Sequence, residues 1–139
     1  MSQQDLSQLS LEDLYRLEVE THTATLALGL EALARDPAAA DELERCMLAA
    51  HSLKGAARIA NVGGAVGLAD AMESCFTAAY QGRLRLNPGL IARLERGVGV
   101  MVAIADGPPD QDAAEAGQAT IESLIAALKR GLDGDAAAA

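Results

Sequence analysis

The chain has 139 residues, a formal net charge of −9 and a hydrophobic content of 50%, which together predict one acidic domain with a buried core. Aromatic residues make up 2% of the chain and alanine and leucine dominate, which favours close-packed helices over a sheet. The acidic balance argues against nucleic acid and against an anionic membrane surface as the main partner.

The first predicted helix covers residues 11–35, with Ser10 as its N-cap and Asp13 three residues further on. Its expected core stripe recurs at steps of three and four residues, at Leu14, Leu17, Thr21, Ala24 and Leu28. Asp36 and Pro37 are expected to stop this helix and to start the next, as its N-cap and first helical residue.

The second predicted helix covers residues 38–60 and ends at the turn 61–64. Its apolar seam has the spacing of a helical bundle, at Leu43, Cys46, Ala50, Leu53, Ala57 and Ala60. The third helix covers residues 65–81, with a stripe formed by Leu68, Met72, Cys75 and Ala79. Cys46 and Cys75 fit no metal-binding spacing, so we expect two reduced thiols in the core.

The fourth predicted helix covers residues 89–105 and follows the cap-and-proline pair Asn87-Pro88. Its inward residues are expected to be Leu90, Leu94, Val98 and Met101. The fifth helix covers residues 113–130, with an apolar stripe of Ile121, Leu124, Ile125 and Leu128. Residues 131–139 are expected to be a disordered tail or the start of a linker, as at the end of an excised domain.

Short connections between long amphipathic helices predict an all-α fold, with no competing strand pattern. We expect an antiparallel four-helix up-down bundle with an additional C-terminal helix, forming one domain over residues 1–130. No run of about 18 apolar residues and no signal peptide is present in the sequence. The expected location is therefore cytoplasmic, without membrane insertion.

The stretch 49–58 carries the main chemical signal of the sequence, Ala-Ala-His-Ser-Leu-Lys-Gly-Ala-Ala-Arg. On a helix, His51 lies beside the apolar seam, on a flank that it shares with Lys54, Gly55 and Arg58. The two cations are unusual in so acidic a chain, and a glycine within a helix costs about 1 kcal/mol relative to alanine. His22 has no such neighbours and is interpreted as an ordinary polar-face residue.

These residue types suit a histidine that receives a phosphoryl group and passes it on. A carboxylate from the antiparallel third helix, at Asp70 or Glu73, can take the hydrogen of one ring nitrogen and leave the other as the nucleophile. The nearby cations can offset the phosphoryl charge, and the glycine lets a partner's loop approach. No glycine-rich nucleotide motif occurs, so we expect no ATP site in this chain.

The run His51-Ser-Leu-Lys-Gly-Ala-Ala-Arg58, followed by Gly67-Leu-Ala69 and Ala71-Met-Glu73, resembles the phosphoacceptor motif of histidine phosphotransfer (HPt) domains. With the five-helix pattern, the chain is similar to the N-terminal domain of CheA-type chemosensory histidine kinases, and among these to the Wsp surface-sensing type. The resemblance implies that His51 is the phosphoacceptor, Lys54 its cationic neighbour and Glu73 the carboxylate that binds the imidazole. Related domains often carry histidine at the position of Asp70, which here could add negative charge or hold Lys54 in an ion pair.

The resemblance also implies partners, in two-component signalling of the chemotaxis type. The phosphoryl donor would be ATP on a histidine kinase catalytic domain, in the same polypeptide or in another chain, and the acceptors would be response-regulator receiver domains. Their Mg²⁺ belongs to the partner, so neither cofactor nor metal is expected in this domain. The docking surface is expected on the second and third helices around His51, with these partner-binding residues: Gly55, Arg58, Met47, Leu48, Ala56 and Ile59.

Other functions remain open from the sequence. One is a non-catalytic helical docking or dimerisation bundle in which His51 is incidental. Another is a phosphotransfer homologue that docks receivers without carrying phosphate, for which Asp70 is the one hint. An enzyme that acts alone fits least, since no set of nucleophile, base and orienting group is recognisable. A metal site at His51, Asp70 and Glu73 is disfavoured by the charge of Lys54.

Overall fold

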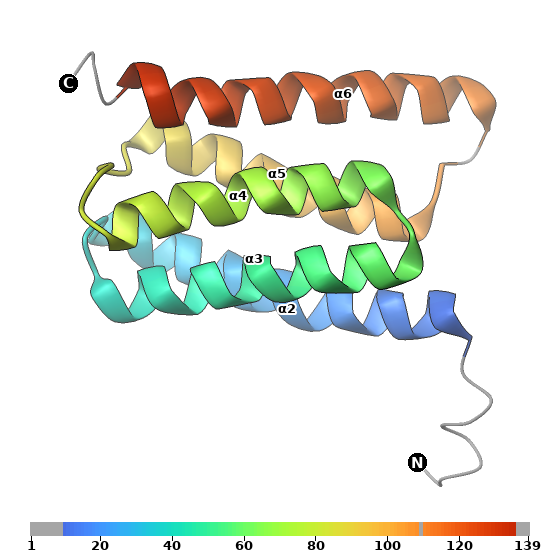
Figure 1. Cartoon of the computed structure of the whole chain (residues 1–139), viewed down its shortest axis with the longest axis horizontal. Helices are drawn as coiled ribbons and strands as arrows, with labels where there is room; N and C mark the ends of the chain where they lie inside the picture. The colour runs from blue at the N-terminus through green and yellow to red at the C-terminus, as the bar shows by residue number, and fades with distance from the viewer. Residues whose placement is uncertain (1–9, 109, 136–139) are drawn as a thin grey trace, which may run out of the picture.

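The computed structural model describes residues 10–108 and 110–135, and this part of the chain contains five α-helices and no strand. The helices are α2 (Leu11–Arg35), α3 (Ala40–Ala60), α4 (Gly63–Tyr80), α5 (Pro88–Asp106) and α6 (Gln111–Arg130). Each helix runs in the opposite direction to the one before it, along a common long axis (Figure 1). The prediction of an all-helical fold is confirmed.

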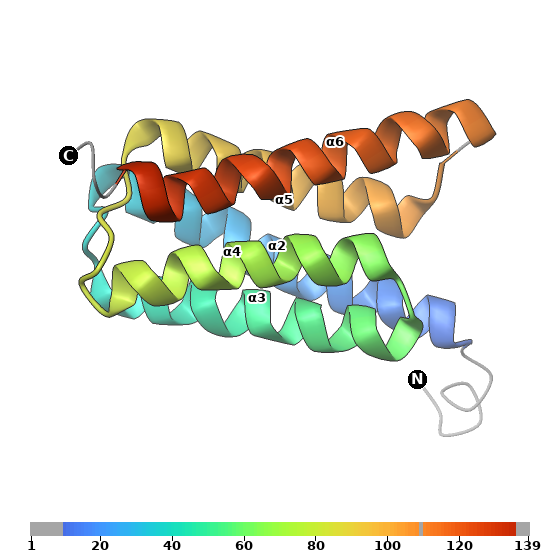
Figure 2. The ribbon, with the colours of Figure 1, turned by 45° about the horizontal axis from the view of Figure 1, so that its top comes forward.

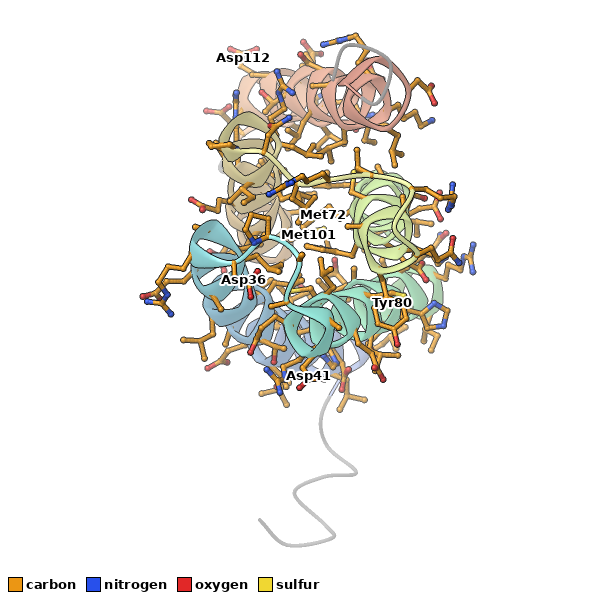
Figure 3. All side chains as sticks on the ribbon, turned by 90° about the vertical axis from the view of Figure 1, so that its left-hand side faces the viewer. Asp36, Asp41, Met72, Tyr80, Met101 and Asp112 are labelled. Atoms are coloured by element: carbon orange, nitrogen blue, oxygen red, sulfur yellow. The ribbon has the colours of Figure 1, made fainter. Side chains whose placement is uncertain are left out.

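The helices enclose one core. Helix α3 packs against α2 and α4, α2 also packs against α5, and α6 lies on α4 and α5 at a distance from α2 and α3 (Figure 2). Viewed along the helix axes, Met72 of α4 and Met101 of α5 point into the space between the helices (Figure 3), where both are fully buried. Gly97 lets α4 and α5 approach closely, because a Cβ at that position would lie 2.9 Å from the Met72 Sδ.

Two predicted helix starts agree with the structure. The Ser10 Oγ accepts a hydrogen bond from the Asp13 N–H at 3.0 Å, and the Asp13 carboxylate accepts one from the Ser10 N–H at 3.3 Å. At the start of α5, the Asn87 Oδ1 accepts a hydrogen bond from the Leu90 N–H at 2.8 Å, with Pro88 as the first helical residue. These side chains satisfy N–H groups that have no partner within a helix.

The predicted start of the second helix at residue 38, with Asp36 as its N-cap, is wrong by two residues. Asp36 instead ends α2, and its carboxylate accepts a hydrogen bond from the Ala38 N–H at 3.2 Å. Its carbonyl accepts a second one from the Ala39 N–H at 3.2 Å, which closes a turn between the two helices. Helix α3 therefore begins at Ala40 without a side-chain cap.

The core stripe predicted for the first helix is also wrong. Leu14, Leu17 and Leu28 are 45%, 48% and 70% exposed. The residues of α2 that are buried form a different series, namely Tyr15, Val19, Thr23, Leu26, Gly29, Leu30 and Leu33. At about 100° per residue, the two series lie on roughly opposite sides of the helix. Helix α2 thus has two apolar faces, and spacing alone does not reveal which one packs inside.

The stripes predicted for the other helices are buried or partly buried, including Ala60, Val98 and Ile125 at their edges. Cys46 and Cys75 are free thiols inside the core, as predicted. Burial raises the pKa of each thiol to about 12, so both remain protonated at neutral pH.

The C-terminal end continues further than expected. Gly131–Asp135 forms a π-helical turn directly after α6, and Leu132 packs partly against the core. The disordered tail predicted from residue 131 therefore begins at least five residues too early, and its remainder, 136–139, lies outside the described residues. None of the described helices is both long and apolar enough to cross a membrane.

Candidate functional site

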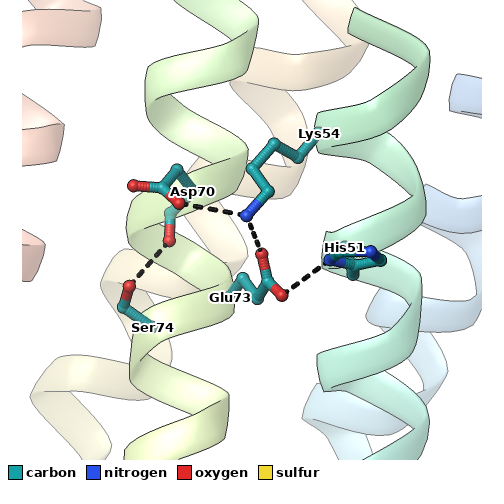
Figure 4. Close-up of polar contacts among 5 residues, drawn as sticks. All are labelled: His51, Lys54, Asp70, Glu73 and Ser74. Atoms are coloured by element: carbon teal, nitrogen blue, oxygen red, sulfur yellow. Dashed lines mark hydrogen bonds and ion pairs between the residues drawn. The ribbon is translucent and has the colours of Figure 1, made fainter. Parts of the chain in front are cut away.

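Helices α3 and α4 bring together four of the predicted site residues (Figure 4). His51 and Lys54 lie three residues apart on α3, and Asp70 and Glu73 lie three residues apart on the facing side of α4. The imidazole and the ammonium group therefore project from one helix towards two carboxylates on its antiparallel neighbour. No loop contributes to this arrangement, so its geometry follows from the packing of two regular helices.

The imidazole of His51 forms a hydrogen bond with Glu73, with a distance of 2.9 Å between Nδ1 and Oε2. A carboxylate only accepts hydrogen bonds, so the hydrogen of the neutral ring must be on Nδ1. The lone pair of Nε2 is then available for reaction. The His51 side chain is 65% exposed, which leaves the ring accessible to another protein.

Glu73 lies between His51 and Lys54. Its Oε1 is buried and contacts the Lys54 ammonium group at 2.5 Å, while its Oε2 contacts the imidazole. The hydrogen bond to Glu73 raises the pKa of Lys54, and Asp70 adds to the effect, against a smaller opposing influence of desolvation. Lys54 therefore stays charged at neutral pH and holds the Glu73 carboxylate in place.

Asp70 forms the ion pair with Lys54 that the sequence allowed, at 3.2 Å between Nζ and Oδ1. The Lys54 side chain is only 13% exposed, and its ammonium group contacts both carboxylates. One ammonium group and two carboxylates give these three side chains a formal charge of −1 beside the imidazole. The charge of Lys54, which the sequence analysis offered to a phosphoryl group, is therefore already balanced by these two carboxylates.

A groove of about 590 Å³ lies beside His51, between α2 and α3. On the α3 side it contains Ser52, the residue after His51, and Gly55, one turn further along. Its walls are mostly apolar and include Leu11, Leu14, Leu17, Ala56 and Ile59. The docking face expected from the sequence combined the second and third helices and did not include α2. The leucines of α2 were missed because two of them had been assigned to the core.

The other predicted contact residues lie around the imidazole on α3. Leu48, Arg58 and Ile59 are exposed, whereas Met47 and Ala56 are half-buried and pack partly against the core. A Cβ at Gly55 would have no heavy atom within 4 Å, so the space above this glycine is open. The surface around His51 therefore has free space above Gly55 and is partly apolar, with the cation Arg58 at its edge.

His22 is separate from this site. Its Nε2 lies 2.9 Å from the Glu18 Oε2 on the same helix, one turn away. Across residues 10–108 and 110–135, no group of three or more histidine, cysteine, aspartate or glutamate side chains is arranged to hold a metal ion. The site described here is thus a single exposed imidazole supported by an ion-paired carboxylate.

The family model of the Hpt domain matches residues 10–133, which cover nearly the whole chain. The chain belongs to the Hpt domain family. Hpt domains are histidine phosphotransfer modules of phosphorelays and interact with kinases and response regulators, which agrees with the accessible imidazole on α3. No curated protein and no solved structure matches this Hpt domain.

Proposed function

We propose that His51 is the phosphoacceptor of this Hpt domain, and that the domain carries phosphoryl groups from an ATP-bound kinase to receiver domains. The observation that carries the proposal is the hydrogen bond between the His51 Nδ1 and Glu73, on a ring whose side chain is 65% exposed. This bond selects Nε2 as the nucleophile and leaves it open to a partner.

The transfer needs two displacement steps. In the first, the Nε2 lone pair attacks the γ-phosphorus of ATP, an N–P bond forms and the P–O bond to ADP breaks. The ring becomes cationic during this attack, and the Glu73 carboxylate next to Nδ1–H stabilises that charge. In the second step, a receiver aspartate attacks the phosphorus, and the N–P electron pair returns to Nε2.

The remaining cluster residues act on Glu73 and on the phosphoryl group in this scheme. Lys54 fixes the position of the Glu73 carboxylate and offsets its charge, while the other carboxylate oxygen holds the imidazole. Asp70 holds Lys54 and adds a second negative charge near the phosphoryl group. Repulsion between that charge and the phosphoryl group should make the phosphorylated state less stable and its transfer to a receiver more favourable.

The groove between α2 and α3 is the surface that we assign to docking of the partner proteins. It adjoins His51, its walls are apolar, and the exposed Leu48 and Ile59 extend the apolar surface along α3. In this arrangement α2 to α5 form the antiparallel four-helix unit that presents His51, and α6 covers α4 and α5 away from the site. The receiver supplies its own Mg²⁺, and the kinase supplies ATP.

The CheA-type assignment, and within it the Wsp type, rests on the motif around His51 and on its continuation through Glu73. It would place the kinase catalytic domain either in the same polypeptide or in a partner chain. Asp70 is where this chain departs from the pattern that related domains often show. We retain the CheA type as the class from which a donor kinase should first be chosen.

The test is ATP-dependent phosphorylation by a CheA-type catalytic domain, comparing the wild type with His51→Gln. His22→Gln is the matched control, since it removes the other histidine of the chain, which lies outside the site. We expect an acid-labile and alkali-stable label on the wild type and on His22→Gln only. Receivers added afterwards should remove it. An unlabelled wild type, with a kinase that is active on another substrate, would favour the non-catalytic docking bundle.

A further inference from the structure

The outer face of α2 carries a second apolar stripe that no part of the described chain covers. It consists of the residues that the sequence analysis had placed in the core, Leu14, Leu17, Thr21, Ala24 and Leu28, and all five are exposed. Single exposed leucines are common on protein surfaces and need no explanation. A regular series at alternating steps of three and four residues, over about 21 Å of helix, is the pattern of a seam that packs against another helix.

The residues beside this seam define the charge that a partner would meet. With Leu14 at heptad position a, the flanking e and g positions hold Asp13, Glu18, Glu20, Thr25, Ala27 and Ala32. Three of these six are acidic and none is basic. Two of the acids have neighbours within α2, since Asp13 caps the helix at Ser10 and Glu18 contacts His22. Their carboxylates still lie along the edges of the seam.

This charge pattern disfavours a second copy of the chain as the occupant. In a parallel pair of α2 helices, position g of one helix faces position e of the other, so Asp13 would meet Glu18. In an antiparallel pair, g faces g and e faces e, which brings acidic or neutral residues together and never opposite charges. Like charges at these positions select against self-association and favour a partner of opposite sign.

We propose that the outer face of α2 binds an amphipathic helix of another protein, with apolar residues at its seam and lysine or arginine at its flanking positions. The net charge of −9 on this domain attracts such a helix from a distance. The bound helix covers Leu28 and, towards the N-terminal end of α2, also Leu17 and Leu14, which both form part of the groove beside His51. Binding therefore restricts access to that groove. This effect on docking rests on the proposed function, whereas the binding of the helix does not.

The probe for this surface is a synthetic peptide of three heptads, with leucine at positions a and d and lysine at e and g. A matched peptide carries glutamate at e and g. We expect the wild type to bind the lysine peptide at least tenfold more tightly than the glutamate peptide, measured by fluorescence anisotropy at physiological salt. Equal binding of the two peptides would overturn the proposal.

Leu28→Ser tests the seam, because Leu28 is 70% exposed and lies outside the groove beside His51. We expect at least tenfold weaker binding of the lysine peptide and unchanged phosphorylation of His51. Tyr80→Ser is the control, since Tyr80 is also an exposed apolar residue but lies at the end of α4. Its binding should match the wild type. Wild-type binding by Leu28→Ser would show binding by charge alone and overturn the proposal. An equal loss in both variants would show that the seam is not specific and would overturn it as well.

The oligomeric state provides an independent test. We expect sedimentation to show a monomer at micromolar concentration for the wild type and for Leu28→Ser. A wild-type dimer that Leu28→Ser dissociates would make a second copy the occupant and overturn the choice of partner. Failure of His51 labelling would leave the peptide result untouched, so the two proposals fail separately.

Discussion

Gly55 lies in the middle of α3, one turn after His51, and a side chain at this position would meet nothing within 4 Å. Glycine within a helix is less favourable than alanine by about 0.5–1 kcal/mol, through the freedom of the unfolded backbone. Gly55→Ala should therefore stabilise the domain by that amount. For a domain of this size, the melting temperature should rise by about 2–6 °C.

The same substitution should impair phosphotransfer. The added methyl group stands on the surface that we assign to docking, beside the exposed imidazole. A loss of close contact worth about 1.4 kcal/mol slows transfer about tenfold. Gly99→Ala is the matched control, because Gly99 is an exposed glycine within α5 that also has nothing within 4 Å of a Cβ. It should stabilise the domain equally and leave the transfer rate unchanged.

The assays are urea unfolding and the rate at which a receiver removes the label from phosphorylated domain. Equal transfer rates for the two alanine variants would refute the placement of Gly55 in the docking surface. A lower free energy of unfolding for Gly55→Ala would refute the open space above α3, since the methyl group would then have met an obstacle.

Three further predictions concern the site and the core. Glu73→Ala removes the acceptor of the His51 Nδ1–H, so phosphorylation should slow about 100-fold. ¹⁵N NMR should then show more of the Nε2–H tautomer, and an unchanged tautomer ratio would contradict the role of Glu73. Asp70→His removes a negative charge whose repulsion of the phosphoryl group is worth about 0.5–1 kcal/mol. The phosphorylated fraction, measured by mass spectrometry, should rise two- to fivefold, and the circular dichroism spectrum should stay unchanged. Equal fractions in the wild type and the variant would refute the repulsion by Asp70. Because burial raises the pKa of Cys46 and Cys75 from 9.0 to about 12, the unfolded chain loses these protons first as the pH rises. Stability should then fall above pH 9 by up to about 1.4 kcal/mol per pH unit for each thiol, and urea unfolding that is the same at pH 7 and pH 10.5 would contradict this.

Much of the fold could be predicted because most of the helices have one apolar face. In α6, the stripe of Ile121, Leu124 and Leu128 is buried. The opposite face carries exposed charged residues such as Glu122 and Arg130, so the spacing alone identifies the side that packs. Local capping was equally clear at Ser10 and Asn87, where a side chain and a nearby N–H determine the helix start. In these cases the information lies within a few residues of the chain.

The predictions failed mainly where the structure depends on residues that are far apart in the sequence. Both faces of α2 are apolar, and the side that packs is decided by α3 and α5, which contact it. The packing side of α2 also decides whether Leu14 lies in the core or in the wall of the groove. The predicted docking surface was therefore wrong for the same reason. At Asp36, the carboxylate accepts the hydrogen bond from the Ala38 N–H that an N-cap would also accept. Residues 37–39 nevertheless form a turn, and α3 begins only at Ala40.

For the site, the sequence predicted which residues take part better than it predicted their contacts. The spacing placed Lys54 next to His51, and the resemblance supplied Glu73, whose hydrogen bond to the imidazole the structure contains. The sequence did not show that Lys54 is enclosed by two carboxylates, because that depends on how α4 is rotated relative to α3.

The location of His51 on the outer surface of a helix, rather than in a cleft, has a consequence for kinetics. An exposed ring nitrogen can face one protein at a time, so the donor must leave before the acceptor can approach. Under the proposed function, the relay would therefore follow a ping-pong order, and each turnover would include the dissociation of two complexes. Strong binding of either partner would slow the flow of phosphate, so evolution of this surface should favour short-lived complexes over tight ones.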